Sequence, residues 1–320
     1  MTIGEESVKM VNAKRARENR QRTKQKRHHV VPQAYLRAWA DNRNQIVVYD
    51  GRADHIFTAD TKNAAVRTKL YTLDLDDGTE TDELERLFAQ VEGPISEGIR
   101  SLRDGTWPMS PDERYLIANF IALQLARAPG IPEATEQMMA QVTEMAAKMQ
   151  SAMSQMKAET SPEEYAAYGA QMDRMRAVSD NPSYSLEEFQ ELHRHPTLLA
   201  LNGVVDLVDP IAHLDYTLLE SDGEEFLTSD QPVAHWPLPG QPAWMSTGLL
   251  NAQKSTLPIS PHLCIQFEVP ADVTAAGSDY RRRVASLEVA RINQRTFLAA
   301  SRHVVMRPGV KYLGFNFPSK

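Results

Sequence analysis

Apolar and polar positions follow a strand-like period near both ends of the chain and a helix-like period in the middle. Alternating runs at 45–49 and 55–58 flank Asp50-Gly51 and predict a β-hairpin. Further strands are predicted at 70–73, 216–220, 225–227, 233–236, 263–269, 304–307 and 312–315. No segment repeats at a fixed period. The pattern predicts an α+β fold with an antiparallel or mixed sheet, built from the N-terminal hairpin and the C-terminal strands.

Helical periodicity marks the middle of the chain. Residues 82–102 carry an apolar face, which Gly93-Pro94 is expected to kink. Ser110-Pro111-Asp112-Glu113 combines a capping residue, a proline and two acids, which is typical of a helix start. The helix that follows is apolar on most sides, so we expect it to be central. Other helices are predicted at 32–39, 186–192, 197–208 and 280–301.

A methionine-rich segment interrupts this order. Eight of the thirteen methionines fall within residues 133–178, and five of them, from Met138 to Met156, are spaced by 7, 4, 4 and 3 residues. This spacing places them along one helix face, and Ser161-Pro162 separates that helix from a second one. We therefore predict a helical-hairpin insertion at 131–182. Its methionine face favours packing, and residues 133–178 are a candidate surface for a homo-oligomer or a protein partner.

Charge separates an N-terminal arm from the remainder of the chain. Residues 1–29 hold nine Lys and Arg against three Glu, about +6, whereas the whole chain carries -7, so the remainder carries about -13. We predict a basic disordered arm at 1–27 and a single α+β domain at 28–320. Residues 9–27 of the arm are a candidate contact for nucleic acid. The alternative is a disordered tail that keeps the protein soluble.

Several classes of protein lack support in the sequence. Cys264 is the only cysteine, so an internal disulfide and a cysteine zinc site are excluded, and Cys264 is expected to be a buried apolar residue. No signal-peptide apolar region and no run of about twenty apolar residues occurs, which predicts a cytoplasmic protein without a membrane partner. The motifs of Rossmann dehydrogenases, P-loop NTPases, α/β-hydrolases and zincins are missing.

His28-His29, directly behind the basic arm, is the first candidate for chemistry. Adjacent imidazoles can bind a metal or transfer a proton near neutral pH. Asn44 and His55 follow at spacings of fifteen and eleven residues from His29, an order similar to His-Me finger nucleases. In that hypothesis His29 activates water and a divalent metal such as Mg or Mn is bound nearby. Alternatively, His29 packs against the face of Tyr35 and Trp39.

Three further polar positions stand out. Asp230, in Thr228-Ser229-Asp230-Gln231-Pro232, lies in a tight turn where it either orients a histidine or metal, or forms an Asx-turn. Arg127 ends the central helix, where it either caps carbonyls or holds a phosphate, with Glu92 as its candidate partner. Asn293 is a polar residue among apolar neighbours, so we expect it to be hydrogen-bonded to a nearby loop.

These segments, in this order, resemble the DUF4238 family over about residues 28 to 310. The resemblance rests on the opening His29-Val30-Val31-Pro32-Gln33-Ala34-Tyr35-Leu36, on the segments 46–49, 120–129, 228–232 and 257–261, and on the helix of Asn293. It marks His29, Pro32, Tyr35, Arg127, Ser229, Asp230, Pro232 and Asn293, but implies no mechanism, because the family has no established activity. His28 is outside its pattern.

The sequence leads to two hypotheses for the function of the protein. In the first, the protein is a hydrolase, nuclease-like, acting on nucleic acid or a phosphate-bearing ligand. His29 is then the general base, Asp230 the orienting residue or metal ligand, and Arg127 the phosphate clamp. Binding of substrate is assigned to Gln33, Tyr35, Ser229 and Asn293. In the second, the protein is a non-catalytic interaction protein whose motif residues hold the fold together, and whose partners bind the methionine-rich hairpin and the basic arm.

Overall fold

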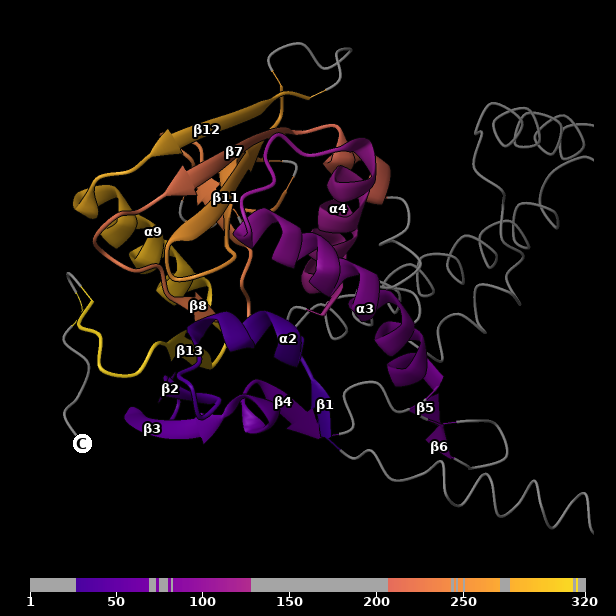
Figure 1. Ribbon diagram of the computed structural model, residues 1–320, viewed down its shortest axis with the longest axis vertical. Coiled ribbons are helices and arrows are strands. Elements are labelled where there is room, and N and C mark those ends of the chain that lie inside the picture. The colour runs from indigo at the N-terminus through magenta and orange to yellow at the C-terminus, as the bar shows by residue number, and fades with distance from the viewer. Residues whose placement is uncertain are drawn as a thin grey trace, which may run out of the picture. The chain divides into compact units, whose positions relative to one another are not determined.

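The computed structural model describes residues 27–68, 73–74, 80–81, 83–127, 207–242, 245, 247–249, 251–270, 277–312 and 315 (Figure 1). All of these belong to one compact unit, drawn from both sides of the segment 130–203. The basic arm at 1–27, except for Arg27, and the methionine-rich insertion lie outside the described residues. Helices and sheets both occur, as the α+β prediction requires.

The N-terminal hairpin is part of a four-stranded sheet. Strands β2 (Gln45–Asp50) and β3 (His55–Asp60) form the predicted hairpin. Strand β13 (His303–Met306) pairs with β2, and β8 (Thr228–Ser229) pairs with β13, which gives the order β3-β2-β13-β8. Every pairing is antiparallel. The prediction that this hairpin joins C-terminal strands is confirmed.

A five-stranded sheet forms the second layer. Its order is β12-β7-β11-β10-β9, with bounds β7 (Asp215–Glu220), β9 (Ala234–Pro237), β10 (Ala252–Pro258), β11 (Leu263–Glu268) and β12 (Asp279–Arg283). The pairing of β12 with β7 is parallel and the others are antiparallel, so the sheet is mixed. Two short pairs complete the strands: β1 (Arg27–His29) with β4 (Val66–Thr68), and β5 (Leu73–Asp74) with β6 (Glu80–Thr81).

Helix α4 begins where the sequence provides a starting signal. In α4 (Pro111–Ala126), Ser110 and Glu113 form a reciprocal capping box. Residues 117–118 and 120–124 of α4 are buried, as expected of a central helix. The other described helices are α2 (Gln33–Leu36), α3 (Glu83–Arg103) and α9 (Ser286–Ala299), the 3-10 turns η1 (Arg37–Trp39) and η2 (Thr61–Asn63), and a helical segment at 207–212.

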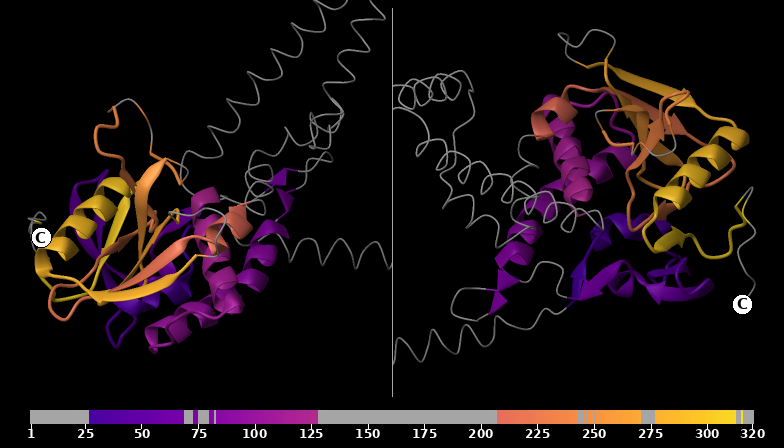
Figure 2. Two further views of the ribbon diagram at one scale, coloured as in Figure 1. Left: turned by 90° about the horizontal axis from the view of Figure 1, so that it is seen from above. Right: turned by 180° about the vertical axis from the view of Figure 1, so that it is seen from behind.

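Helix α9 packs against both sheets (Figure 2). Its Val289 and Ile292 contact a cluster on the five-stranded sheet that includes Leu219 and the buried Cys264. Its Phe297 packs against Tyr49 and other residues of the four-stranded sheet. Tyr216 lies three residues before Leu219 in β7, so it faces the opposite side, where α4 lies. Apolar side chains between these layers form the core.

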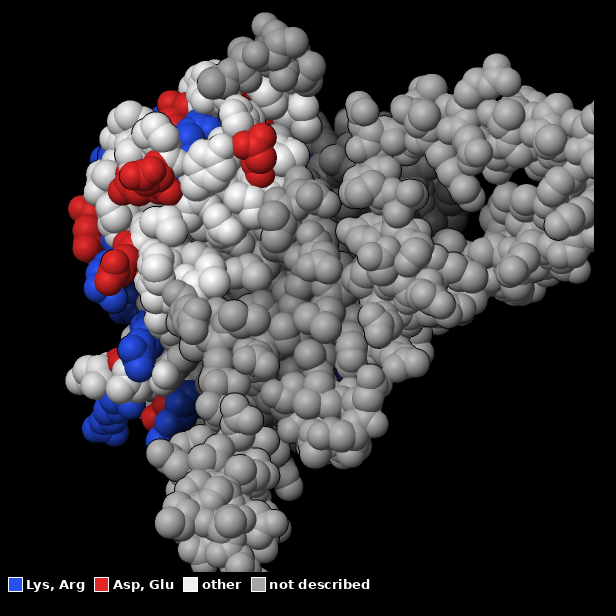
Figure 3. Space-filling model, turned by 90° about the vertical axis from the view of Figure 1, so that its right-hand side faces the viewer, with Lys and Arg blue, Asp and Glu red and all other residues white. Residues whose placement is uncertain are grey.

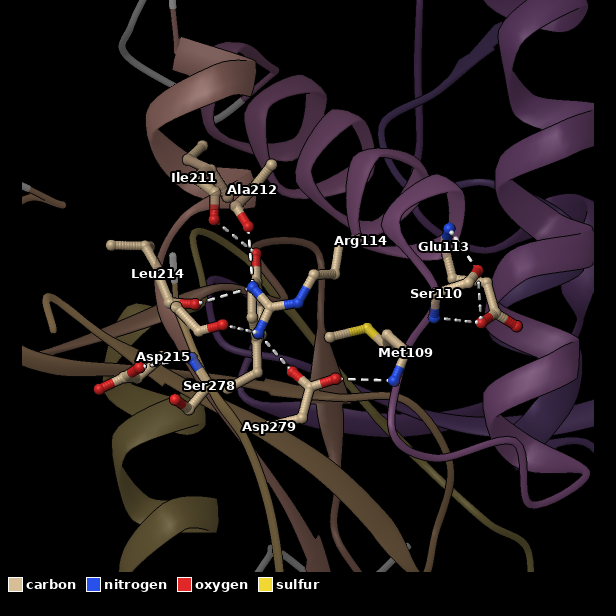
Figure 4. A network of polar contacts seen from close by, with 12 residues as sticks. Met109, Ser110, Glu113, Arg114, Ile211, Ala212, Leu214, Asp215, Ser278 and Asp279 are labelled. Atoms are coloured by element: carbon tan, nitrogen blue, oxygen red, sulfur yellow. Dashed lines mark hydrogen bonds and ion pairs between the residues drawn. The ribbon is translucent and has the colours of Figure 1, made fainter. Parts of the chain in front are cut away.

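A polar network anchors α4 to the five-stranded sheet (Figure 4). The Arg114 guanidinium donates to the carbonyls of Ala212, Leu214 and Gly277 and pairs with Asp279 at 2.5 Å. It also lies 5.0 Å from the centre of the Tyr216 ring. Because the Arg114 and Asp279 side chains are 13% and 6% exposed, this charge pair is buried and its donors are engaged internally. We call it the Arg114 network.

The structure differs from the sequence-based prediction at three places. Residues 225–227 form no strand, since the short strand β8 begins at Thr228. The helix predicted at 280–301 begins only at Ser286, because 279–283 pair with β7 as the edge strand β12. No strand is formed by Tyr312 or Phe315, the described residues of the predicted strand 312–315. In addition, β10 was not predicted, because its polar residues at 253–255 obscure the alternation.

Candidate functional site: a His–Asp row on the four-stranded sheet

The register of the four-stranded sheet aligns ionisable side chains across its strands. Asp50, at the end of β2, lies directly opposite His55 of β3 and His303 of β13. Directly opposite residues in an antiparallel sheet share a face, with Cβ atoms about 5 Å apart. A carboxylate is therefore flanked by two imidazoles, His55 and His303, which are 248 residues apart in the sequence.

Asp230 extends this line by one strand. Val304 pairs with Ser229, so the next position along each strand brings His303 opposite Asp230, and the Asp230 N–H donates to the His303 carbonyl at 2.9 Å. The order across the sheet is thus His55, Asp50, His303 and Asp230. We call these four residues the His–Asp row. Acids and imidazoles alternate along it, which suits the transfer and stabilisation of a proton.

Asp50 is the stronger acid of the two carboxyl groups in the row. Asp50 is 2% exposed, and its Oδ1 accepts hydrogen bonds from the backbone N–H groups of Arg52 and Ala53. The other oxygen accepts from Nε and Nη2 of Arg302, at 2.9 and 2.7 Å. These hydrogen bonds from Arg302 hold the pKa of the Asp50 carboxyl well below its ordinary value, despite its burial.

In Asp230 the effect of burial on the carboxyl pKa outweighs the effect of the hydrogen bonds. It is 3% exposed, and its Oδ1 accepts from the backbone N–H groups of Ser301 and Arg302 at 2.9 and 3.3 Å. Burial raises the pKa of Asp230, and the two backbone donors and His303 only partly oppose that effect. Together with its own N–H, Asp230 fixes three consecutive residues, 301 to 303. It therefore positions His303 from the side opposite Asp50.

His303 is the proton-transfer candidate of the row. Its Nε2 lies 3.6 Å from Asp50 Oδ2, and its side chain is 15% exposed. Burial lowers the pKa of His303, although both carboxylates act in the opposite direction. The ring is therefore neutral at pH 7 and can accept a proton that Asp50 and Asp230 would then stabilise.

Arg302 supplies a cation at the solvent side of the row. Its side chain is 46% exposed, and Asp50 engages only its Nε and Nη2 atoms. Among the hydrogen bonds of the described residues, none involves Arg302 Nη1. A guanidinium held along one edge by a carboxylate can still donate from its other edge to an anion.

His29 lies in a different sheet. It ends β1, opposite Val66 of β4, and it is half-buried. Asn44 and His55 belong to the turn before β2 and to β3, so the structure divides the His29, Asn44 and His55 series between two sheets. His55 instead belongs to the His–Asp row.

Arg127 and Asn293 have the partners that the sequence suggested. Arg127 Nη1 donates to Glu92 Oε1 at 2.7 Å, and the Arg127 side chain is 1% exposed. The Asn293 amide accepts from the Leu227 N–H and donates to the Glu225 carbonyl. Asn293 thus holds the segment that leads into β8, as the expectation for a buried asparagine required.

The remaining predicted binding residues make internal contacts. The Tyr35 hydroxyl donates to the Pro258 carbonyl and lies 2.8 Å from Thr228 Oγ1, and burial raises the Tyr35 pKa. Gln33 donates to Thr61 Oγ1, and Ser229 Oγ donates to the Gln231 carbonyl. Three segments of the family pattern, those of Tyr35, Thr228 and Pro258, therefore meet in the core.

Sequence reasoning found Asp230 but missed Asp50, His55, Arg302 and His303 as its partners. The signal available was weak, because the sequence marks Asp50 only as a turn residue and His303 precedes the predicted strand 304–307 by one position. Within the described ranges, no three His, Cys, Asp or Glu side chains are grouped closely enough to hold a metal ion. The Mg or Mn site stays a prediction.

None of the helices among the described residues combines the length and apolar character needed to cross a bilayer.

Comparison with known proteins identifies a family. No curated protein and no solved structure matches the chain. Residues 27–309 match the model of DUF4238, a protein family of unknown function, and this range includes Asp50, Asp230 and His303. The chain therefore belongs to the DUF4238 family.

Proposed function

We propose that the protein is a hydrolase of phosphate esters, in which His303 rather than His29 is the general base. The observation that carries the proposal is a partly exposed imidazole between two buried carboxylates, with the half-exposed Arg302 beside it. Perturbed ionisable groups from distant elements, gathered at one point, are typical of functional sites.

Each residue has a distinct task in this proposal. His303 accepts a proton from water, the water oxygen attacks phosphorus, and the ester P–O bond breaks. The leaving oxygen takes a proton from solvent, and His303 then releases its proton to solvent. Asp50 and Asp230 stabilise the imidazolium that forms, and Arg302 Nη1 binds a phosphate oxygen. The assay varies the ester, with nucleic acids among the substrates, and it varies the metal ion, Mg or Mn.

The Arg run of β12 is less suited to contact phosphate than Arg302. Arg281, Arg282 and Arg283 pair with Glu220, Glu288 and Asp222, so acids neutralise this run. On the described part of the face in Figure 3, Lys and Arg side chains lie next to Asp and Glu side chains. Arg302 is therefore preferred, because it adjoins the proton acceptor.

The test is hydrolysis of p-nitrophenyl phosphate, bis-p-nitrophenyl phosphate, DNA and RNA, with and without Mg²⁺ or Mn²⁺. Replacing His303 by Gln should lower kcat by about 10²- to 10⁴-fold, the range for loss of a general base. His262→Gln is the matched control, because His262 is half-exposed at the β10–β11 turn. If His29→Ala abolishes activity while His303→Gln does not, the assignment to His303 is wrong.

A second function is favoured by the internal bonding of the motif residues. Tyr35, Thr228 and Asn293 are buried and hydrogen-bonded within the core, as expected if they serve only to hold the fold of an interaction protein. Absence of hydrolysis on all four substrates, together with folded His303→Gln protein, would favour this interaction function over the hydrolase.

A further inference from the structure

At the exposed end of the His–Asp row, the ring of Phe57 contacts the rings of both His55 and His303. The imidazole of His55 stacks on the Phe57 ring, with centroids 5.3 Å apart and an interplanar angle of 23°. Phe57 in turn meets the His303 ring edge-on, at 6.3 Å and 79°. Three rings therefore lead from solvent to the proposed general base.

His55 is placed to contact a ligand. It is exposed, and it stands on β3, the outermost strand of the four-stranded sheet. Phe57 covers one side of the imidazole, as the near-parallel ring planes require, so a further ring can stack only on the other side. An exposed imidazole backed by a phenyl ring is a rigid platform for a planar group.

The cation lies at the same end of the strands. Arg302 is bonded to Asp50, and Asp50 is directly opposite His55. A ligand that stacks on His55 and reaches Arg302 must therefore carry both a flat aromatic ring and an anionic group. Nucleotides have this construction, and bases stack on aromatic side chains with little dependence on sequence.

We propose that the His–Asp row takes a nucleotide, with its base stacked on His55 and its phosphate at Arg302 and His303. This deepens the proposed function and rests on it for the fate of the phosphate. It adds a specificity-determining residue, His55, and narrows the substrate class from phosphate esters in general to nucleotides or single-stranded nucleic acid. Inorganic phosphate and sugar phosphates lack the ring that His55 would hold.

The experiment measures binding rather than turnover. Isothermal titration compares AMP with ribose 5-phosphate, which lacks the base, on wild type, His55→Ala, His55→Tyr and the control His262→Ala. Chromatography after each titration establishes whether the ligand is intact. Stacking of one base is expected to favour AMP about tenfold in wild type. His55→Ala should remove that preference, whereas His55→Tyr and His262→Ala should retain it.

The outcomes separate the two proposals. Equal affinity for AMP and ribose 5-phosphate in wild type, failure of both to bind, or an unchanged preference in His55→Ala would overturn the nucleotide assignment. Because His55 is exposed, its replacement leaves the core intact, and an unchanged melting temperature verifies this. A base preference without hydrolysis of any ester would leave the nucleotide site standing while refuting the hydrolase.

Discussion

The Arg114 network and the His–Asp row are both built from charges that come from distant parts of the chain, yet they are suited to different tasks. Around Arg114, carbonyls and one carboxylate engage the guanidinium, and no imidazole is among these hydrogen-bond partners. The row instead contains a histidine whose pKa is lowered by burial, between two acids. Exposure also rises from the buried Asp50 of the row to its half-exposed partner Arg302. Burial of charge alone therefore does not indicate function; an exchangeable proton and an open side do.

Removing the Arg114 guanidinium should have the largest effect. Arg114→Ala leaves Asp279 and several carbonyls buried without their donor, so we expect a loss of about 3–5 kcal/mol in the free energy of unfolding. Urea denaturation measures it. The matched control is Arg281→Ala, which breaks an exposed pair with Glu220 and should cost less than about 1 kcal/mol. Similar costs for both variants would mean that the Arg114 network is not an anchor.

Asp50→Asn should be the most costly change within the row. It removes the charge that Arg302 binds, and we expect about 1.5–3 kcal/mol at pH 7, the range for hydrogen bonds to charged groups. Because the folded pKa of Asp50 is lowered, its carboxylate stabilises the protein fully at pH values above the unfolded pKa of about 4. This stabilisation is lost as the pH falls from there through the folded pKa. Denaturation should therefore show a smaller difference in the free energy of unfolding between wild type and variant at pH 3 than at pH 7.

Asp230→Asn should cost less than Asp50→Asn, about 1 kcal/mol or below, since asparagine keeps an oxygen for the N–H groups of Ser301 and Arg302. The pH dependence has the opposite sign. The folded pKa of Asp230 is raised, so its contribution is fully present below the unfolded pKa and is lost as the pH rises through the folded value. A cost larger than that of Asp50→Asn would reverse the order proposed for the row.

His303→Gln should have the smallest effect on stability at pH 7, within about 1 kcal/mol, because the ring is neutral there. Its folded pKa is lowered, so on acidification the unfolded state binds the proton first and wild type loses stability as the pH falls below about 6.5. The variant should lack that part of the loss. Thermal denaturation between pH 7.5 and 5 compares them, and parallel curves would contradict the lowered pKa.

The elements that the sequence predicted well are those with local causes. The hairpin follows from Asp50-Gly51 between alternating runs, and α4 follows from its capping box. Strand β12 was missed because Arg281, Arg282 and Arg283 are exposed on both faces of an edge strand, which leaves no apolar alternation to detect. Its position depends on pairing with residues of β7 that lie 63 residues earlier, and local propensity contains no such information.

The site was predictable only in part for the same reason. Asp230 and Asn293 were identified from local sequence, and the partners of Asn293 agree with the expectation. His303 could not be joined to Asp50 and Asp230, because a sheet register between residues 50, 230 and 303 determines that contact. A shift of one residue would send His303 to the other face.

Direct titration of the His303 imidazole by NMR tests the central claim most closely. The His303→Gln spectrum assigns its signal among the nine histidines. The account predicts a pKa below the ordinary 6.5 of histidine, and a still lower pKa in Asp50→Asn, because Asp50 raises the His303 pKa and its loss leaves Arg302 unpaired. A wild-type pKa at or above 6.5, or one that does not respond to Asp50→Asn, would contradict the proposal that the row holds a neutral proton acceptor.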